Sequence, residues 1–131
     1  NQPFIADMTE AALTNDYDTA ERLRDALSRR ARACQAAFDA AKGLSSFPPK
    51  GGMFMMVDVS QTGLSGEAFA WRLLEEEAVA VMPGESFGAE AGHLIRLGLT
   101  LPDDELAEAV RRIAALASRL CEAGAEAATP A

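Results

Sequence analysis

The sequence contains few of the residues on which metal sites and redox chemistry depend. Among its 131 residues there are two cysteines and one histidine. Cys34 and Cys121 lie far apart with no CxxC partner, so we expect neither a metal site nor a redox pair, but two buried thiols in a reducing cytoplasm. His93 has no second histidine or cysteine nearby, which argues against a zinc site and a hydrolytic triad.

Long hydrophobic runs and positive charge are also scarce. No apolar run approaches the roughly 20 residues that a membrane helix needs, and the N-terminus lacks the basic region of a signal peptide. The 20 acidic and 12 basic residues give a formal net charge of −8, which disfavours nucleic acid and anionic membranes as partners. With 49% hydrophobic and 24% charged residues, the composition is that of one globular domain.

The positive charge that is present is mostly arginine, and five of the arginines lie within residues 22–32. Such a helix face could bind an acidic partner, or it could be a solvated face with internal ion pairs, such as Asp25 with Arg29 at i,i+4 spacing. The two lysines, Lys42 and Lys50, occupy a helix C-terminus and a Pro/Gly turn. Neither position predicts the enclosed site that a Schiff-base lysine needs.

Hydrophobic periodicity predicts two helices at the N-terminal end, over residues 3–13 and 16–42. Polar residues 14–16 are expected to separate them, and Gly43 is expected to follow the second helix as its C′ residue. The chain starts at Asn1, not at Met, and enters a helix at once. We therefore expect the sequence to be a fragment of a larger enzyme, with residues 1–43 as a helical segment that connects to a missing large domain.

Residues 44–123 predict a small α+β unit in the order β-α-β-β-α, with helices on one face of a three-stranded sheet. The strand expected at residues 53–59 is nearly all apolar, which predicts burial on both faces. A turn-rich segment precedes it, and Ser65 is expected to cap the following helix. A frayed tail is expected over residues 124–131. The remaining elements are expected as strands at residues 79–82 and 93–99, and as helices at residues 66–77 and from 103 onward.

Arg96 is the first candidate for chemistry. Strand alternation places Ile95, Leu97 and Leu99 on one face, and Arg96 with Gly98 on the other. A guanidinium in so apolar a strand needs an anion, and its planar fork suits a carboxylate. Gly98 leaves room beside it. The alternatives are an arginine on a solvated sheet face, or one paired with a glutamate of the chain.

Two glycine-containing loops are further candidates. Phe87 lies between glycines in the loop at residues 83–88, and Gly51 and Gly52 precede the strand at residues 53–59. Each loop could let the backbone approach a ligand, or could be a plain turn.

Three segments together resemble the C-terminal small domain of class I/II aminotransferases, which have the aspartate aminotransferase fold and use pyridoxal phosphate (PLP). They are PKGGMF at residues 49–54, VAVMPGESFG at residues 79–88 and IRLGL at residues 95–99. Residues 1–47 are similar to the helix pair that precedes this domain, so the resemblance covers nearly the whole chain. Residues 51–74 and 92–99 most resemble arginine–pyruvate transaminases.

The resemblance implies that Arg96 binds the α-carboxylate of an amino acid or a 2-oxo acid, such as arginine and pyruvate. It also implies that the PLP lysine and the other cofactor-binding residues lie upstream of Asn1, so the fragment alone is expected to be inactive. Gly51, Gly52 and Phe87 become candidate edges of the active site. We expect a homodimer in the cytoplasm.

Two alternatives stay open at this point. The β-α-β-β-α order also resembles an incomplete ACT-like module, which binds amino acids without chemistry. The same small domain also occurs in other PLP enzymes, including C–S lyases, since the reaction is decided largely by the missing domain.

Overall fold

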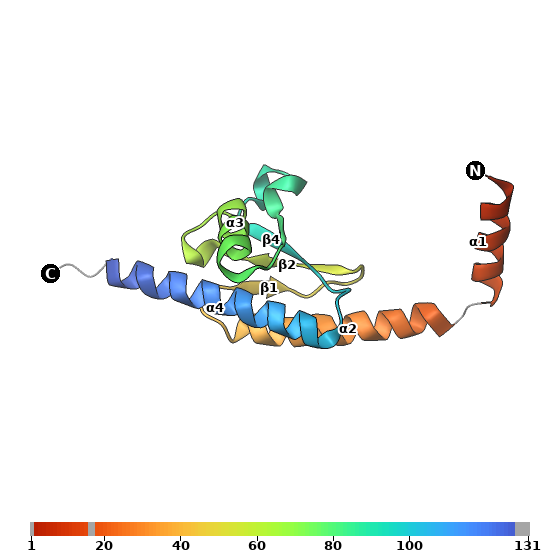
Figure 1. The fold of residues 1–131 in the computed structure, drawn as a ribbon, viewed down its shortest axis with the longest axis horizontal. Helices are drawn as coiled ribbons and strands as arrows, with labels where there is room; N and C mark the ends of the chain where they lie inside the picture. Colours follow the sequence, from red (N-terminus) through yellow and green to blue (C-terminus); the bar gives the residue numbers. More distant parts are fainter. Residues whose placement is uncertain (1, 16–17, 128–131) are drawn as a thin grey trace.

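The computed structural model describes residues 2–15 and 18–127, and its mixture of helices with one small sheet confirms the predicted α+β class (Figure 1). None of the described helices is both long and apolar enough to cross a membrane. The helices are α1 (Pro3–Asn15), α2 (Asp18–Asp39), α3 (Gly66–Glu77) and α4 (Asp103–Ala127), and the strands are β1 (Ser45–Phe47), β2 (Phe54–Asp58), β3 (Met82–Pro83) and β4 (Leu94–Gly98).

The sheet is antiparallel and has the order β1-β2-β4-β3. The chain therefore leaves β2, passes through α3 and returns in β3 on the far side of β4. The prediction of three strands was wrong by one, because β1 lies in the segment expected to be only turns. With three residues, β1 is too short to show a period, and its pairing with β2 defines it (Ser46 opposite Val57).

Both N-terminal helices differ at their ends from the sequence prediction. Thr14 and Asn15 remain within α1, because their side chains donate to the carbonyls of Glu10 and Ala11 in the preceding turn, at 2.7 and 2.9 Å. Asp16, the third residue of the predicted break, lies outside the described residues. The second helix ends at Asp39, earlier than expected, and Gly43 follows with φ 83°, which favours glycine.

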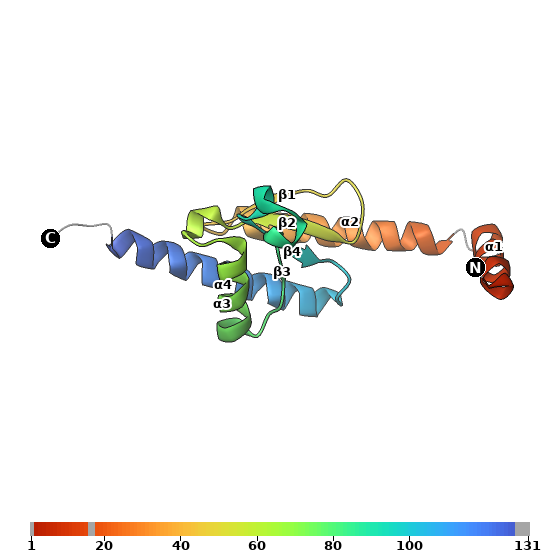
Figure 2. The same cartoon turned by 90° about the horizontal axis from the view of Figure 1, so that it is seen from above.

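One face of the sheet forms the core. Met55 and Val57 of β2 and Ile95 and Leu97 of β4 are buried against α2, α3 and α4. Figures 1 and 2 show α2 and α4 side by side along the long axis of the molecule. Phe54, by contrast, is 45% exposed, so the prediction that this strand is buried on both faces was wrong. All three packed helices lie on the same side of the sheet, and no described α-helix covers the other side.

Helix α4 supplies the predicted apolar stripe, with Leu106, Val110, Ile113 and Ala117 buried. It continues through Gly124 to Ala127, where the sequence predicted a frayed tail from Gly124. Residues 128–131 of that predicted tail lie outside the described part of the chain.

Charged residues connect α2 to α4. Asp103, in the first turn of α4, accepts hydrogen bonds from Arg30 and Arg29, and these bonds lower the pKa of its carboxyl group. Arg30 also donates to the carbonyl oxygen of Leu99 at 3.0 Å. The predicted pair of Asp25 with Arg29 was wrong, because Arg29 bonds across the helix interface instead.

We predict that Asp103→Asn lowers the melting temperature more than Asp104→Asn does. Both residues lie in the first turn of α4, but the structure shows ion pairs for Asp103 alone of the two. A carboxylate with a lowered pKa in the folded state stabilises the fold above its unfolded pKa of about 3.9, and loses that effect as the pH falls. Thermal unfolding from pH 7 to pH 2 should show the gap between the variants closing below about pH 4. An equal loss for both variants at pH 7 would contradict the assigned role.

Candidate functional site

Arg96 lies in the middle of β4, on the sheet face that no helix covers. The predicted alternation is confirmed, since Ile95, Leu97 and Leu99 are buried and Arg96 is half-buried on the opposite face. Its neighbours across the sheet are Met56 of β2 on one side and Met82 of β3 on the other. The strand thus holds the backbone of Arg96 from both sides and directs its side chain away from the core.

Two aromatic rings enclose the guanidinium. Its carbon atom lies 4.8 Å from the ring centroid of Phe54 and 4.6 Å from that of Phe87. Contacts at this distance attract a cation to the ring face. The rings come from β2 and from the 3₁₀ turn Gly84–Phe87, so that two segments distant in the sequence fix the position of one charge.

Within residues 2–15 and 18–127, no carboxylate forms an ion pair with Arg96. Arg96 differs in this respect from most of the other arginines that follow the first turns of α2. Arg30, Arg72, Arg112 and Arg119 all bind acidic side chains of the chain itself. Of the alternatives that the sequence left open, pairing with a glutamate is therefore wrong. The fork of Arg96 keeps its donors for another anion.

A hollow of ≈ 380 Å³ lies beside Arg96 and can admit a small molecule. Gly98 forms part of its wall, and a Cβ atom built there would meet nothing within 4 Å, so the space next to the guanidinium is open. The lining contains no acidic residue and consists of Met53, Phe54, Ala80, Val81, Met82, Arg96, Gly98 and Thr100. An apolar wall around one cation suits a carboxylate with a carbon chain.

The sequence named three candidate edges of this site, and the structure brings one of them to Arg96. Phe87 lies over the guanidinium. Gly51 and Gly52 line a different hollow, of ≈ 430 Å³, between the loop before β2 and helix α2. Met53 lines both hollows, so the two spaces are neighbours. The assignment of Gly51 and Gly52 to an active-site edge stays a prediction.

Phe54 is the site residue that sequence reasoning missed. It was read as part of a strand buried on both faces, which left it no role outside the core. The sequence carries no local signal for it, because its position opposite Gly98 across the β2–β4 pair is known only from the structure.

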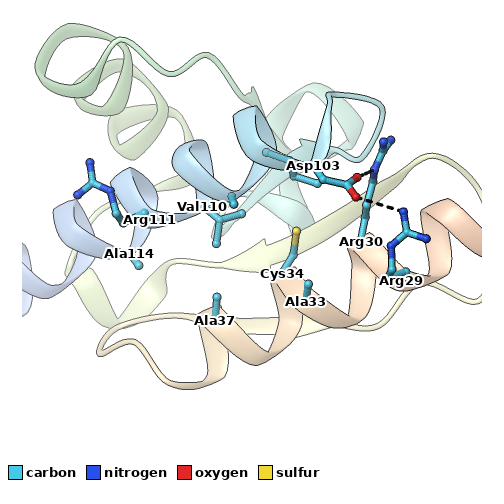
Figure 3. Close-up of a pocket in the computed structure, with 11 residues that line it drawn as sticks. Arg29, Arg30, Ala33, Cys34, Ala37, Asp103, Val110, Arg111 and Ala114 are labelled. Atoms are coloured by element: carbon cyan, nitrogen blue, oxygen red, sulfur yellow. Dashed lines mark hydrogen bonds and ion pairs between the residues drawn. The ribbon is translucent and has the colours of Figure 1, made fainter.

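A second groove, of ≈ 540 Å³, runs between α2 and α4 (Figure 3). Small apolar side chains such as Ala33, Ala37 and Ala114 line it. Its cations are already paired: Figure 3 shows Arg29 and Arg30 reaching Asp103, and Arg111 bonds Glu108, whose pKa falls to about 2 through its bonds to Arg111 and Arg112. This groove therefore offers no free charge to an anionic ligand.

Neither lysine fits a Schiff-base role in this structure. Lys42 and Lys50 are both exposed, whereas a lysine that forms an imine with PLP must lie in a site that lowers its pKa. In the described parts of the chain, no group of three or more His, Cys, Asp or Glu side chains could hold a metal ion. The chemistry available here is the binding of an anion.

Among the described residues, this α+β unit presents Arg96 without an acidic partner on the sheet face opposite the helices, where its charge is available to an anion. Comparison with known proteins identifies the family to which this unit belongs. The family model for aminotransferase class I and II matches residues 2–113, and the chain belongs to this family. The resemblance stated from the sequence is thus confirmed, and it displaces the interpretation as a stand-alone ACT-like module.

Individual relatives agree with the family assignment. The arginine–pyruvate transaminase of Pseudomonas aeruginosa is 44% identical over 117 residues, which cover 89% of this chain and 30% of that protein. An aromatic aminotransferase structure from Pyrococcus horikoshii OT3 superposes with a TM-score of 0.76 at 28% identity, over 82% of this chain and 29% of the other. A PLP-bound protein from Clostridium difficile 630 gives a TM-score of 0.75 at 29% identity, over 80% and 27% of the two chains. The chain therefore spans about 30% of the length of this Pseudomonas relative.

Proposed function

We propose that this chain is the substrate-carboxylate-binding part of a longer PLP-dependent aminotransferase, which transfers the amino group of an L-amino acid to a 2-oxo acid. The observation that carries the proposal is Arg96, half-buried between two aromatic rings with no carboxylate partner in the described chain. Family membership indicates the class of reaction. The geometry provides one site for the carboxylate that both substrates carry.

Arg96 contributes orientation. Amino acids and 2-oxo acids both carry a carboxylate on the carbon next to the reacting centre, so one arginine can hold the donor and the acceptor in turn. Two parallel N–H···O bonds fix the plane of the carboxylate as well as its position. Holding the substrate at that end limits the orientations of its reacting carbon, which is the source of the rate gain expected from positioning.

The cofactor's covalent attachment does not fit the residues of this chain, because both lysines are exposed. We therefore assign PLP to the remainder of the longer protein. Both cysteines are free thiols, but only Cys34 is buried, so the expectation of two buried thiols was wrong for Cys121. We keep the cytoplasm as the proposed location, which cell fractionation can test.

Arginine as amino donor and pyruvate as acceptor are the first substrates to test, since the Pseudomonas relative carries both in its name. The Arg96 hollow contains no acidic side chain to bind a substrate guanidinium, so a donor's own cationic end would have to be held elsewhere. A PLP lyase of the same fold, such as a C–S lyase, is the second candidate. An assay of the longer protein with a panel of amino donors, and with pyruvate and 2-oxoglutarate as acceptors, separates these functions by its products.

We predict that this chain on its own self-associates through its N-terminal helices, whose apolar faces are expected to pack on the large domain in the longer protein; the longer protein itself is expected to be a homodimer. Helix α1 has no buried residue, and Phe4, Ile5 and Met8 are 46–67% exposed, which is an unusual apolar surface for a free helix. Light scattering should give a mass of two chains or more, and hydrogen exchange should slow in α1 as concentration rises. A monomer with unchanged exchange across α1 would contradict this prediction.

We predict that Arg96→Ala lowers kcat/KM for amino acids by orders of magnitude in the longer protein. Loss of one partner of a charge-assisted pair typically costs about 2–5 kcal/mol. Arg96→Lys keeps the charge but loses the fork, so its loss should be smaller. The absorption spectrum of the bound cofactor should stay nearly unchanged.

The control for Arg96 is an amine donor without an α-carboxylate. Its slow reaction should hardly change in Arg96→Ala, since it offers no group for the guanidinium to hold. If both kinds of donor were impaired equally, Arg96 would be a structural residue and the assignment would fail.

We predict that this chain, mixed with PLP and reduced with borohydride, gives no stoichiometric adduct. Lys42 and Lys50 are both exposed, whereas a Schiff-base lysine needs an enclosed site. Peptide mapping by mass spectrometry is the measurement. Complete labelling of either lysine alone would place the cofactor in this chain and overturn the division of roles proposed above.

A further inference from the structure

We infer that Glu85 is a positioning residue of the substrate site, whose carboxylate holds the Gly84–Phe87 turn on the N-terminal end of α3 and so keeps Phe87 over Arg96. The inference rests on the function proposed for Arg96. It concerns a residue that touches neither substrate nor guanidinium in the structure, and it follows from the way in which this turn is attached.

The first step concerns the free N–H groups of α3, four of which need acceptors at the start of any helix. Ser65, the predicted cap, satisfies one of them, because its side chain accepts from Ala68 N at 3.2 Å; its carbonyl accepts the first bond within the helix, from Phe69 N at 2.9 Å. The segment that follows β3 satisfies two more. Gly92 O accepts from Gly66 N at 2.8 Å, and Glu85 Oε1 accepts from Glu67 N at 3.2 Å. The helix end thus anchors residues 85–92.

The second step concerns the side chain of Glu85 itself. Its other carboxylate oxygen, Oε2, is buried and has no hydrogen-bond partner in the described structure. A negative charge at this point is favoured by the positive end of the α3 dipole. Gly66 allows the approach, because a Cβ atom there would lie 3.2 Å from Oε2 and would collide with the carbonyl of Leu94. The carboxylate therefore sits in a space that the helix leaves for it.

The third step connects this anchor to the site. Gly84 is buried, and a Cβ atom there would lie 2.7 Å from the same carbonyl of Leu94, two residues before Arg96. Gly88 N donates to Glu85 O at 3.1 Å and closes the turn from which Phe87 projects. The start of β4, the turn and the N-terminal end of α3 meet at one point, and the Glu85 side chain bonds the turn to α3.

The fourth step is that Phe87 has little else to hold it. Phe87 is 52% exposed, and within the described part of the chain its one cation–ring contact is with Arg96. The position of the ring therefore depends on the conformation of the turn. Without the Glu85 anchor, the turn loses a helix-end bond and gains freedom, and one of the two faces that orient the guanidinium is lost.

The test uses the longer, PLP-loaded protein with amino acids and with an amine donor that lacks the α-carboxylate. Glu85→Ala should raise KM for the amino acid about tenfold, the size of one charge-assisted hydrogen bond, with kcat changed less than about twofold. Glu85→Asp keeps the charge on a shorter side chain and should also raise the KM for the amino acid. It replaces Glu85→Ala in the test if that variant does not fold. Glu90→Ala is the matched control, because Glu90 is exposed in the same segment and forms no side-chain hydrogen bond or ion pair in the described structure. The KM of this variant for the amino acid should not change.

A double variant separates positioning from general destabilisation. If Glu85 acts through Phe87, the KM of Glu85→Ala/Phe87→Ala should equal that of Phe87→Ala alone. Additive effects, or an equal KM increase for both kinds of donor, would overturn the inference. Failure of the proposed function has a different signature, because Arg96→Ala would then impair both donors equally, whatever the Glu85 variants do.

Discussion

The pairing of β2 with β4 is the constraint on which the rest of the structure depends. Its register puts Met55 and Val57 beside Leu97 and Ile95 on the helix-covered face. Because side chains alternate along a strand, the same register sends Phe54 and Arg96 to the free face. A slip of one residue would bury the arginine in the core and expose the apolar side chains. The energetics that hold the core together therefore also fix the position of the binding group.

The free face explains why the guanidinium is held by rings and not by a carboxylate. A glutamate placed beside Arg96 would orient it equally well, but would occupy the donors that an incoming substrate needs. Aromatic faces attract the cation and leave its N–H groups free in the plane of the fork. The arginines on α2 and α4 show the opposite arrangement. Asp103 and Glu108 form ion pairs with them, so these charges stabilise helix contacts and do not form a binding site.

Sequence reasoning succeeded where a local period carries the information. Alternation in residues 94–99 gave the correct face for Arg96, and the helical steps gave the buried stripe of α4. It failed where partners are distant along the chain. Arg29 pairs with Asp103, 74 residues away, and not with the neighbouring Asp25, and no local pattern contains that choice. The three residues of β1 are likewise a strand because β2 lies beside them.

Only some residues of the candidate site could be predicted from the sequence, for the same reason. Phe87 could be named from its place between glycines, and the role proposed for Arg96 rests on the charge in an apolar strand together with the family resemblance. Phe54 could be found only by knowing that all the helices cover one face, which is a property of the packed domain. The role proposed for Glu85 was even less predictable, because an acidic residue in a turn can be given such a role only when the N-terminal end of α3 is known to pack against it. Residues that bind could be read from composition and period, whereas residues that position them depend on the packing of elements that lie apart in the sequence.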